Sequence, residues 1–166
     1  MSAQFINDHP FIRNKVNIRA DQIVSPGFLD VRNPENDALS FVIYTGIALT
    51  PLAQGQPGNW IKTIVQIEIN TGNGRKWTKN PDRGPGWTFL DSAVATAAPV
   101  SMINTRTSPC GWAVDDLRVD IQGRAGDPDQ PPGDEYLTLL LVVAVFDLDT
   151  TIHRINYQVT AVGREM

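Results

Sequence analysis

Two adjacent carboxylates, Asp115 and Asp116, are the first residues whose types and spacing suggest chemistry. They stand in the stretch CGWAVDDLRVDIQG, residues 110–123, which otherwise alternates between apolar and polar residues as a β-strand does. Trp112 and Val114, before the acids, have the opposite parity to the apolar residues that follow them. A β-bulge inserts one residue and produces this change of phase. We therefore expect a bulge at the acid pair, because an inward carboxylate without a partner is costly.

A cation is the alternative explanation for the acid pair. Calcium takes six to eight oxygen ligands, and a structural calcium ion at Asp115 and Asp116 stays open as an alternative to a purely structural role. The acidic stretch 127–135, DPDQPPGDE, does not match the twelve-residue EF-hand loop. The two histidines and the single cysteine show no ligand spacing for a transition metal. No other cofactor is expected.

The stretch GWAVDDLRV, residues 111–119, resembles a strand found in many jelly-roll, galactose-binding-like modules. The pattern there is Gly–aromatic–x–Ile/Val–Asp–Asp–Ile/Val–x–Val, and the group includes carbohydrate-binding modules and extracellular adhesin domains. The resemblance covers only this strand. It implies a jelly-roll-like sheet around the acid pair.

An aromatic loop, GRKWTKNPDRGPGWTF at residues 74–89, is the best candidate for ligand binding. Flat aromatic rings beside polar side chains suit sugar stacking, but Trp and Arg are also favoured anchors of protein interfaces. A third interpretation is that each tryptophan covers one end of the core. The candidate ligand-binding residues are Trp77, Trp87, Arg83 and Lys79.

Enzyme signatures are thin, and the sequence predicts a protein that is not an enzyme. A nucleophile–histidine–acid triad needs a well-placed histidine, but His9 lies near the N-terminus and His153 follows a predicted turn. Neither Gly-x-Ser-x-Gly nor a phosphate-binding loop occurs. Adjacent strand residues point to opposite faces, so Asp115 and Asp116 are poorly placed to flank one glycosidic bond.

The elements that position these residues are predicted to be short β-strands. The 13 glycines and 12 prolines divide the chain, and period-two alternation marks residues 41–49, 60–70 and 152–162. Only 92–98 tolerates a helix. We expect an all-β protein, an antiparallel jelly-roll-like β-sandwich of about eight strands with minimal helix. Weaker strands are expected near 28–32, 87–95, 100–104 and 112–121.

Residues 136–147, YLTLLLVVAVFD, differ from the other strands because both faces are apolar. This pattern predicts a central strand, or a strand that faces a partner subunit. The turn that follows predicts a hairpin with 152–162. Leu140 and Val142 are therefore candidate interface residues.

Residues 1–27 carry scattered apolar side chains without a regular period, and we interpret them as an extended N-terminal arm before one domain at 28–166. Phe5, Phe11 and Ile12 are its candidate interface residues. The arm can pack on its own sandwich or on a neighbouring copy, and the sequence leaves both open.

Composition narrows the classes of partner. The net charge is −4 and the 14 Lys and Arg residues are scattered, which argues against nucleic-acid binding. No apolar run approaches the ~20 residues of a membrane-spanning helix, and no apolar signal-peptide core is present. One cysteine excludes an intrachain disulfide. The chain is expected to be soluble, in the cytoplasm or in an assembled particle.

The leading functional hypothesis is a non-catalytic structural subunit that associates with copies of itself into a homo-oligomer or particle. A carbohydrate-binding, lectin-like module that uses the tryptophan-bearing loop is the first alternative. A toxin or adhesin component is the second.

Overall fold

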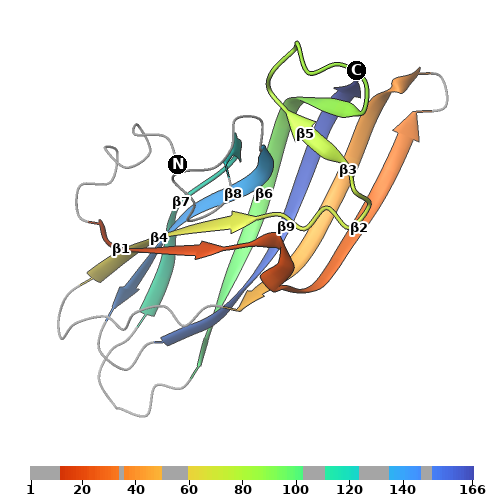
Figure 1. Ribbon diagram of the computed structural model, residues 1–166. Helices are drawn as coiled ribbons and strands as arrows, with labels where there is room; N and C mark the ends of the chain where they lie inside the picture. Colours follow the sequence, from red (N-terminus) through yellow and green to blue (C-terminus); the bar gives the residue numbers. More distant parts are fainter. Residues whose placement is uncertain (1–11, 34–35, 50–59, 103–110, 124–134, 147–150) are drawn as a thin grey trace.

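The computed structural model describes residues 12–33, 36–49, 60–102, 111–123, 135–146 and 151–166, which form two β-sheets packed face to face (Figure 1). Sheet A has the strand order β1–β4–β8–β7, and sheet B has the order β2–β3–β9–β6–β5. The strands of sheet A are β1 (Ile12–Ile18), β4 (Trp60–Glu68), β8 (Tyr136–Phe146) and β7 (Gly111–Gln122). The strands of sheet B are β2 (Ile23–Asn33), β3 (Asn36–Leu49), β9 (Thr151–Glu165), β6 (Trp87–Met102) and β5 (Lys76–Thr78).

The all-β sandwich is confirmed. In the described part of the chain the only helical element is η1, a single 3-10 turn at Ala20–Gln22. The helix-tolerant stretch 92–98 lies inside β6, where Ala93, Ala95 and Ala97 pack against the core at every second position. Small residues at this period let β6 approach the opposite sheet, so packing decides the conformation there rather than helix propensity.

The sheets are mixed rather than wholly antiparallel, which corrects the expectation from the sequence. β1 runs parallel to β4 and β5 runs parallel to β6, in each case at the edge of a sheet. Between β1 and β4 the chain crosses to sheet B and makes the β2–β3 hairpin. When the chain returns to sheet A, strand β4 runs in the same direction as β1. All other pairs are antiparallel.

The predicted hairpin of 136–147 with 152–162 is wrong. β8 pairs with β4 and β7 in sheet A, whereas β9 pairs with β3 and β6 in sheet B. Each of the two strands is therefore central in its own sheet, and the segment between them joins the two layers. The two-sided apolar pattern correctly predicts the central position of β8, but it says nothing about which strand is its neighbour.

The main core lies between the sheets. Leu139, Leu141 and Val143 of β8 point into it, and each is completely buried. Full burial of one such side chain stabilises the fold by about 1.5–3 kcal/mol. Their principal partners in the core are Val42, Tyr44, Val65, Ile67, Trp77, Ile155, Tyr157 and Val159.

The second apolar face of β8 is also buried within the single chain. Leu140 and Val142 form a small cluster with Ile64 of β4, and their exposed fractions are 0%, 0% and 2%. The expectation that Leu140 and Val142 lie in a subunit interface is therefore wrong for this chain, because no surface of either side chain is left for a partner.

The expected boundary between arm and domain at residue 27 falls inside β2. Residues 12–18 pair with β4 and residues 23–33 pair with β3, so the described part of the arm belongs to the sandwich of the same chain. Ile12 is the first residue of β1 and pairs with Lys62. Phe5 and Phe11 lie outside the described residues.

Candidate functional site

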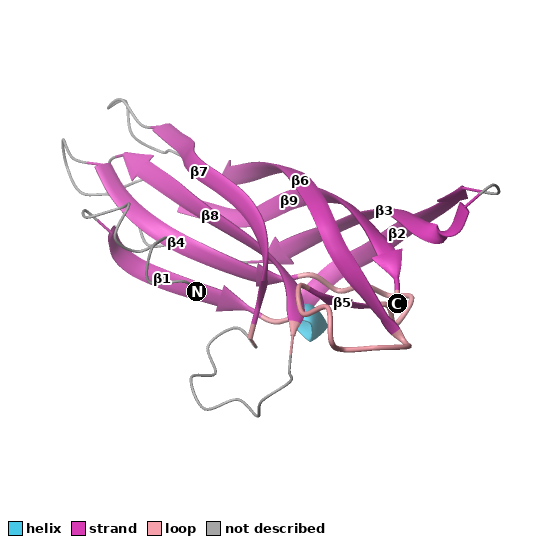
Figure 2. Ribbon diagram, turned by 90° about the horizontal axis from the view of Figure 1, so that it is seen from above, coloured by secondary structure: helices cyan, strands magenta, loops and turns pink. Residues whose placement is uncertain are grey.

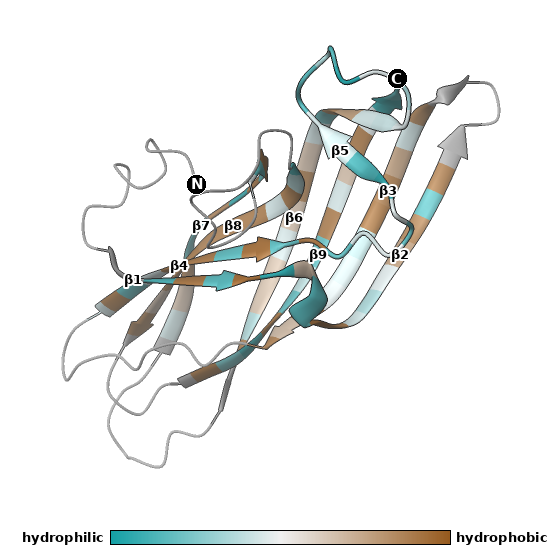
Figure 3. Ribbon diagram, viewed as in Figure 1, coloured by the Kyte–Doolittle hydropathy of each residue, from teal (hydrophilic) through white to brown (hydrophobic). Residues whose placement is uncertain are grey.

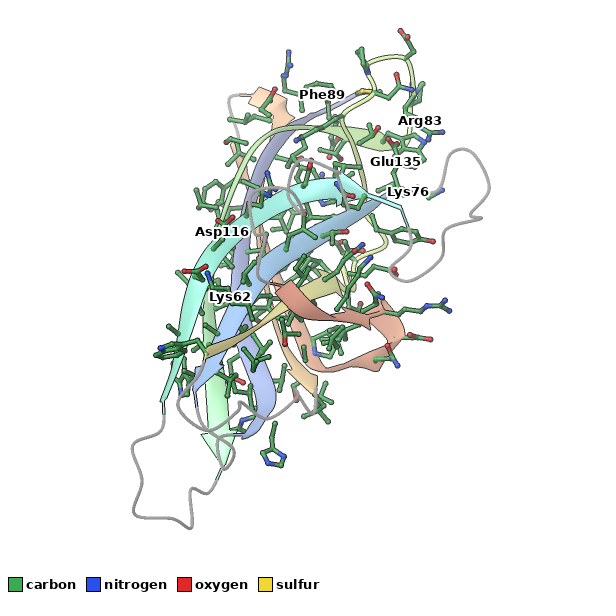
Figure 4. The ribbon with its side chains drawn as sticks, turned by 90° about the vertical axis from the view of Figure 1, so that its left-hand side faces the viewer. Lys62, Lys76, Arg83, Phe89, Asp116 and Glu135 are labelled. Carbon is green, nitrogen blue, oxygen red and sulfur yellow. The ribbon has the colours of Figure 1, made fainter. Side chains whose placement is uncertain are left out.

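The tryptophan-bearing loop and its partners lie together at one end of the sandwich, where β5 and the start of β6 meet the turn 79–86 (Figure 4). Trp77 is part of β5 rather than of a loop, and only 1% of it is exposed. Its indole Nε1–H donates to the Tyr44 hydroxyl at 2.8 Å, and the two rings meet edge to face. Trp77 is therefore a core residue. Its prediction as a ligand-binding residue is wrong, because the pairing of β5 with β6 turns the indole inward.

Lys79 and Arg83 bind carboxylates that lie beside sheet A. The Lys79 ammonium lies 2.7 Å from Asp120 of β7. Arg83 Nε donates at 2.9 Å to Glu135, the residue before β8, as Figure 4 shows. Burial alone would raise the pKa of Asp120, but hydrogen bonds from Lys79 and from a backbone N–H outweigh it and hold the pKa below its usual value. Both cations therefore fasten the turn to the opposite sheet.

The turn itself is held by short-range hydrogen bonds. The Thr78 hydroxyl accepts from the Asn80 N–H at 2.9 Å and donates to Glu135 at 2.6 Å. The Asn80 side chain accepts from the Asp82 N–H at 2.9 Å. Gly86 has a φ of 91°, which favours glycine over every other residue. These contacts fix the approach of the chain to Trp87.

Trp87 begins β6 and is half-buried, with two cations near its ring. The Arg83 guanidinium lies 4.7 Å from the ring centroid, and the Lys76 ammonium lies 5.6 Å from it. Both distances are within the range of a cation–π interaction. Of the two tryptophans predicted to bind ligand, only Trp87 has accessible surface.

Arg75 is the residue at this end that sequence reasoning missed. Its side chain is 9% exposed, and its guanidinium contacts Asp30 at 2.5 Å and Glu165 at 3.2 Å. It also donates to the Ser40 hydroxyl at 2.6 Å and to the Thr88 hydroxyl at 3.2 Å. One side chain therefore links β2, β3, β6 and β9. A single arginine between glycines and a lysine gives no periodic signal, so the sequence did not reveal this role.

A pocket of about 350 Å³ opens beside Arg75 and Trp87. Polar and charged groups dominate its wall, and two glycines, Gly74 and Gly86, form open parts of the rim. It is lined by Asp30, Asn73, Gly74, Arg75, Lys76, Gly86, Trp87, Thr88, Glu165 and Met166.

The acid pair lies on sheet A, away from this pocket (Figure 4). Val114 pairs with Val143 and Asp116 with Val142, so Asp115 is the inserted residue of a bulge, as the change of phase predicts. The Asp115 carboxylate lies 2.7 Å from the Lys62 ammonium. Within the described ranges, no group of three or more His, Cys, Asp or Glu side chains is close enough to hold a metal ion.

The outer face of sheet B carries several exposed apolar side chains. Figure 3 shows hydrophobic segments, in brown, along β2 and β3. Opposed residues of its strands share this face. One row joins Leu29, Ile43, Thr160 and Val94, and the next joins Val31, Phe41 and Val162. The large apolar side chains that are most exposed on this face are Val24, Leu29, Val31, Phe41, Leu49 and Val94.

No protein-family model, curated protein or solved structure matches this chain. In the part of the chain that the structure describes, no helix has the length and apolar character needed to cross a bilayer. A functional proposal therefore depends on the surfaces and contacts of the chain itself.

Proposed function

We propose that this protein is a non-catalytic structural subunit that associates with copies of itself through the outer face of sheet B. The observation that carries the proposal is the row of exposed apolar side chains on β2, β3 and β6. Val94 has 69% of its surface exposed and Leu29 has 58%, although both are apolar and lie on one continuous face. Uncharged polar side chains, among them Thr160 and Gln158 of β9, stand between these apolar ones, and exposed apolar side chains gathered on one face mark interaction sites.

The size of this face sets the area that one copy can bury. Phe41 and Leu49 lie eight residues apart on β3, which is about 27 Å at ~3.4 Å per residue, and four strands separated by three spacings of ~4.8 Å span about 14 Å. The flat footprint is then roughly 400 Å², and the relief of the side chains increases the accessible area. A standard interface buries about 800 Å² of accessible surface on each partner.

The charge distribution favours a second copy as the partner. The centre of the face carries uncharged polar side chains, with Thr45, Gln158 and Thr96 in one row. Charged residues lie at the two ends of the face. At one end Arg154 of β9 is opposite Leu49 of β3, and at the other Arg164 forms an ion pair with Asp91 at 2.8 Å. Two identical faces can therefore stack without bringing like charges together at the centre. Sheets stacked in this way lie about 10 Å apart, with their strands within about 30°.

The shape of sheet B adds to this argument. The paired strands β2 and β3 extend beyond the rest of the sandwich, as Figure 2 shows. β2 is also the edge strand of the sheet, and a long edge strand is a surface that other chains can pair with. A projecting, partly apolar ribbon can reach a neighbour without displacing any element of its own chain.

Sedimentation velocity over a wide range of protein concentration tests the proposal. The wild-type chain is expected to associate, and Leu29→Lys is expected to shift the population to monomers, because a charge is buried without a partner at the interface. Trp112→Lys is the matched control: Trp112 is 40% exposed on β7 of sheet A, so its replacement is expected to leave association unchanged. A wild-type protein that stays monomeric at the highest reachable concentration would refute self-association. Equal association of both variants would refute this surface.

A further inference from the structure

The pocket beside Trp87 combines three features of a small-ligand site. Its volume, about 350 Å³, lies within the range of about 300–1,000 Å³ that is usual for such sites. Its floor is rigid, because Arg75 is fixed by Asp30, Ser40, Thr88 and Glu165. Its wall contains an aromatic ring with accessible surface. This arrangement is independent of the outer face of sheet B, since the pocket opens at the end of the sandwich.

The charges in the pocket decide the class of ligand. Two cations, Arg75 and Lys76, and two carboxylates, Asp30 and Glu165, line the pocket, so its charged side chains balance one another. A phosphate ion would meet both carboxylates, and a metal ion would meet both cations. A neutral ligand meets neither repulsion and is therefore favoured over an ion of either sign.

The hydrogen-bonding groups favour hydroxyls. The Glu165 carboxylate is 41% exposed and accepts hydrogen bonds, whereas the Lys76 ammonium is exposed and donates them. The Lys76 ammonium lies 5.6 Å from the centroid of the Trp87 ring, so this donor stands beside the aromatic wall of the pocket. A hydroxyl both donates and accepts, so adjacent hydroxyls on one molecule can satisfy the carboxylate and the ammonium together.

The ring of Trp87 supplies the apolar contact. Arg83 lies 4.7 Å and Lys76 lies 5.6 Å from the centroid of this ring, and of the two cations only Lys76 lines the pocket, so a ligand at the ring also lies beside the Lys76 ammonium. The C–H groups on one face of a sugar ring are apolar and pack well on an indole. We infer that this pocket binds an uncharged saccharide unit, with Trp87 as the stacking surface and with Lys76 and Glu165 as partners of its hydroxyls.

The test is an NMR titration of the ¹⁵N-labelled full chain with glucose, galactose, mannose and N-acetylglucosamine, each raised to tens of millimolar. At least one sugar is expected to shift the Trp87 indole N–H and the Gly86 amide. Trp87→Ala and Lys76→Ala are each expected to weaken binding by about fivefold or more. Trp60→Ala is the matched control, because Trp60 is 52% exposed but lies at the start of β4, at the opposite end of that strand from the pocket.

Each result of the titration decides the inference. If Trp87→Ala lowers the melting temperature so far that the variant unfolds, the test of the inference is Lys76→Ala. The Lys76 side chain is exposed, so its replacement removes no core contact. Absence of any shift with all four sugars would overturn the inference. So would inorganic phosphate causing the same shifts at lower concentration than every sugar. The titration is repeated with Leu29→Lys, and equal binding there separates this inference from the assembly proposal.

Discussion

The hydrogen bond between Trp77 and Tyr44 should be one of the strongest single polar contributions to the stability of the core. The Tyr44 hydroxyl accepts from the Trp77 indole N–H at 2.8 Å, and the exposed fractions of the two residues are 0% and 1%. Tyr44→Phe removes the acceptor and changes little else in the packing. The indole N–H then stays buried without the hydrogen bond that it makes in the wild-type protein.

The expected cost follows from that buried donor. A polar group that is left buried without a partner costs about 1–3 kcal/mol of unfolding free energy. A value near 2 kcal/mol corresponds to a fall in melting temperature of about 4–8 °C for a domain of this size. Tyr157→Phe is the matched control. Tyr157 is 4% exposed, and its hydroxyl has only a marginal hydrogen bond, to the backbone of Asn70, so removal of that hydroxyl should cost less than removal of the Tyr44 hydroxyl.

Urea unfolding followed by far-ultraviolet circular dichroism measures both variants. A double-mutant cycle with Trp77→Phe isolates the pair, and the double variant is expected to lose less than the sum of the single losses by about 1 kcal/mol or more. The reasoning fails if Tyr44→Phe stays within about 0.5 kcal/mol of the wild type. It also fails if Tyr157→Phe is the more damaging of the two.

Three further outcomes are expected. Gly163→Ala should lower the unfolding free energy by about 3 kcal/mol in the same urea assay, because the added Cβ would lie 2.1 Å from the Phe89 carbonyl oxygen, which is backbone and cannot move aside. Burial raises the pKa of Tyr44 and of Tyr157, so the folded state favours the neutral phenols. The contribution of these two phenols to the unfolding free energy should then be constant below about pH 10 and fall as the pH rises above it, less steeply in Tyr157→Phe, in urea titrations at a series of alkaline pH values. Deletion of Asp115 should leave a cooperative melt with a loss below about 2 kcal/mol, because the strand on either side of the bulge keeps its pairing and the ion pair with Lys62 is exposed; a molten protein would contradict the bulge.

The local features of this fold are predicted correctly from the sequence. Alternation of apolar and polar residues predicts β3, β4 and β9, because each has one face on the core and one face turned away from it. The change of phase at Asp115 and Asp116 correctly predicts the bulge, because one extra residue is the simplest way to keep both parts of β7 in register with β8. The two-sided pattern of β8 predicts its central place in a sheet.

The pairing of distant strands is not predictable from such patterns. Alternation is the same whether a strand pairs with its neighbour in sequence or with one far away, so β8 and β9 read as a hairpin although they lie in different sheets. Trp77 stands between charged residues in a turn-rich stretch, and only the pairing of β5 with β6 determines that it is buried. The contacts of Arg75 depend on four strands meeting at one point, which no local window contains.

The central place of β8 and β9 has a consequence for the order in which this protein can acquire structure. Both sheets are organised around strands that a ribosome produces after the other described strands, since β8 begins at residue 136 and β9 at residue 151. Until then β4 and β7 have no common neighbour, and β3 and β6 are equally separated. Pairing of strands that are far apart in the sequence is slow, and strands that are not yet paired expose edges that can aggregate. During synthesis the strands made before β8 and β9 therefore keep unpaired edges, which can aggregate, until these two strands have emerged.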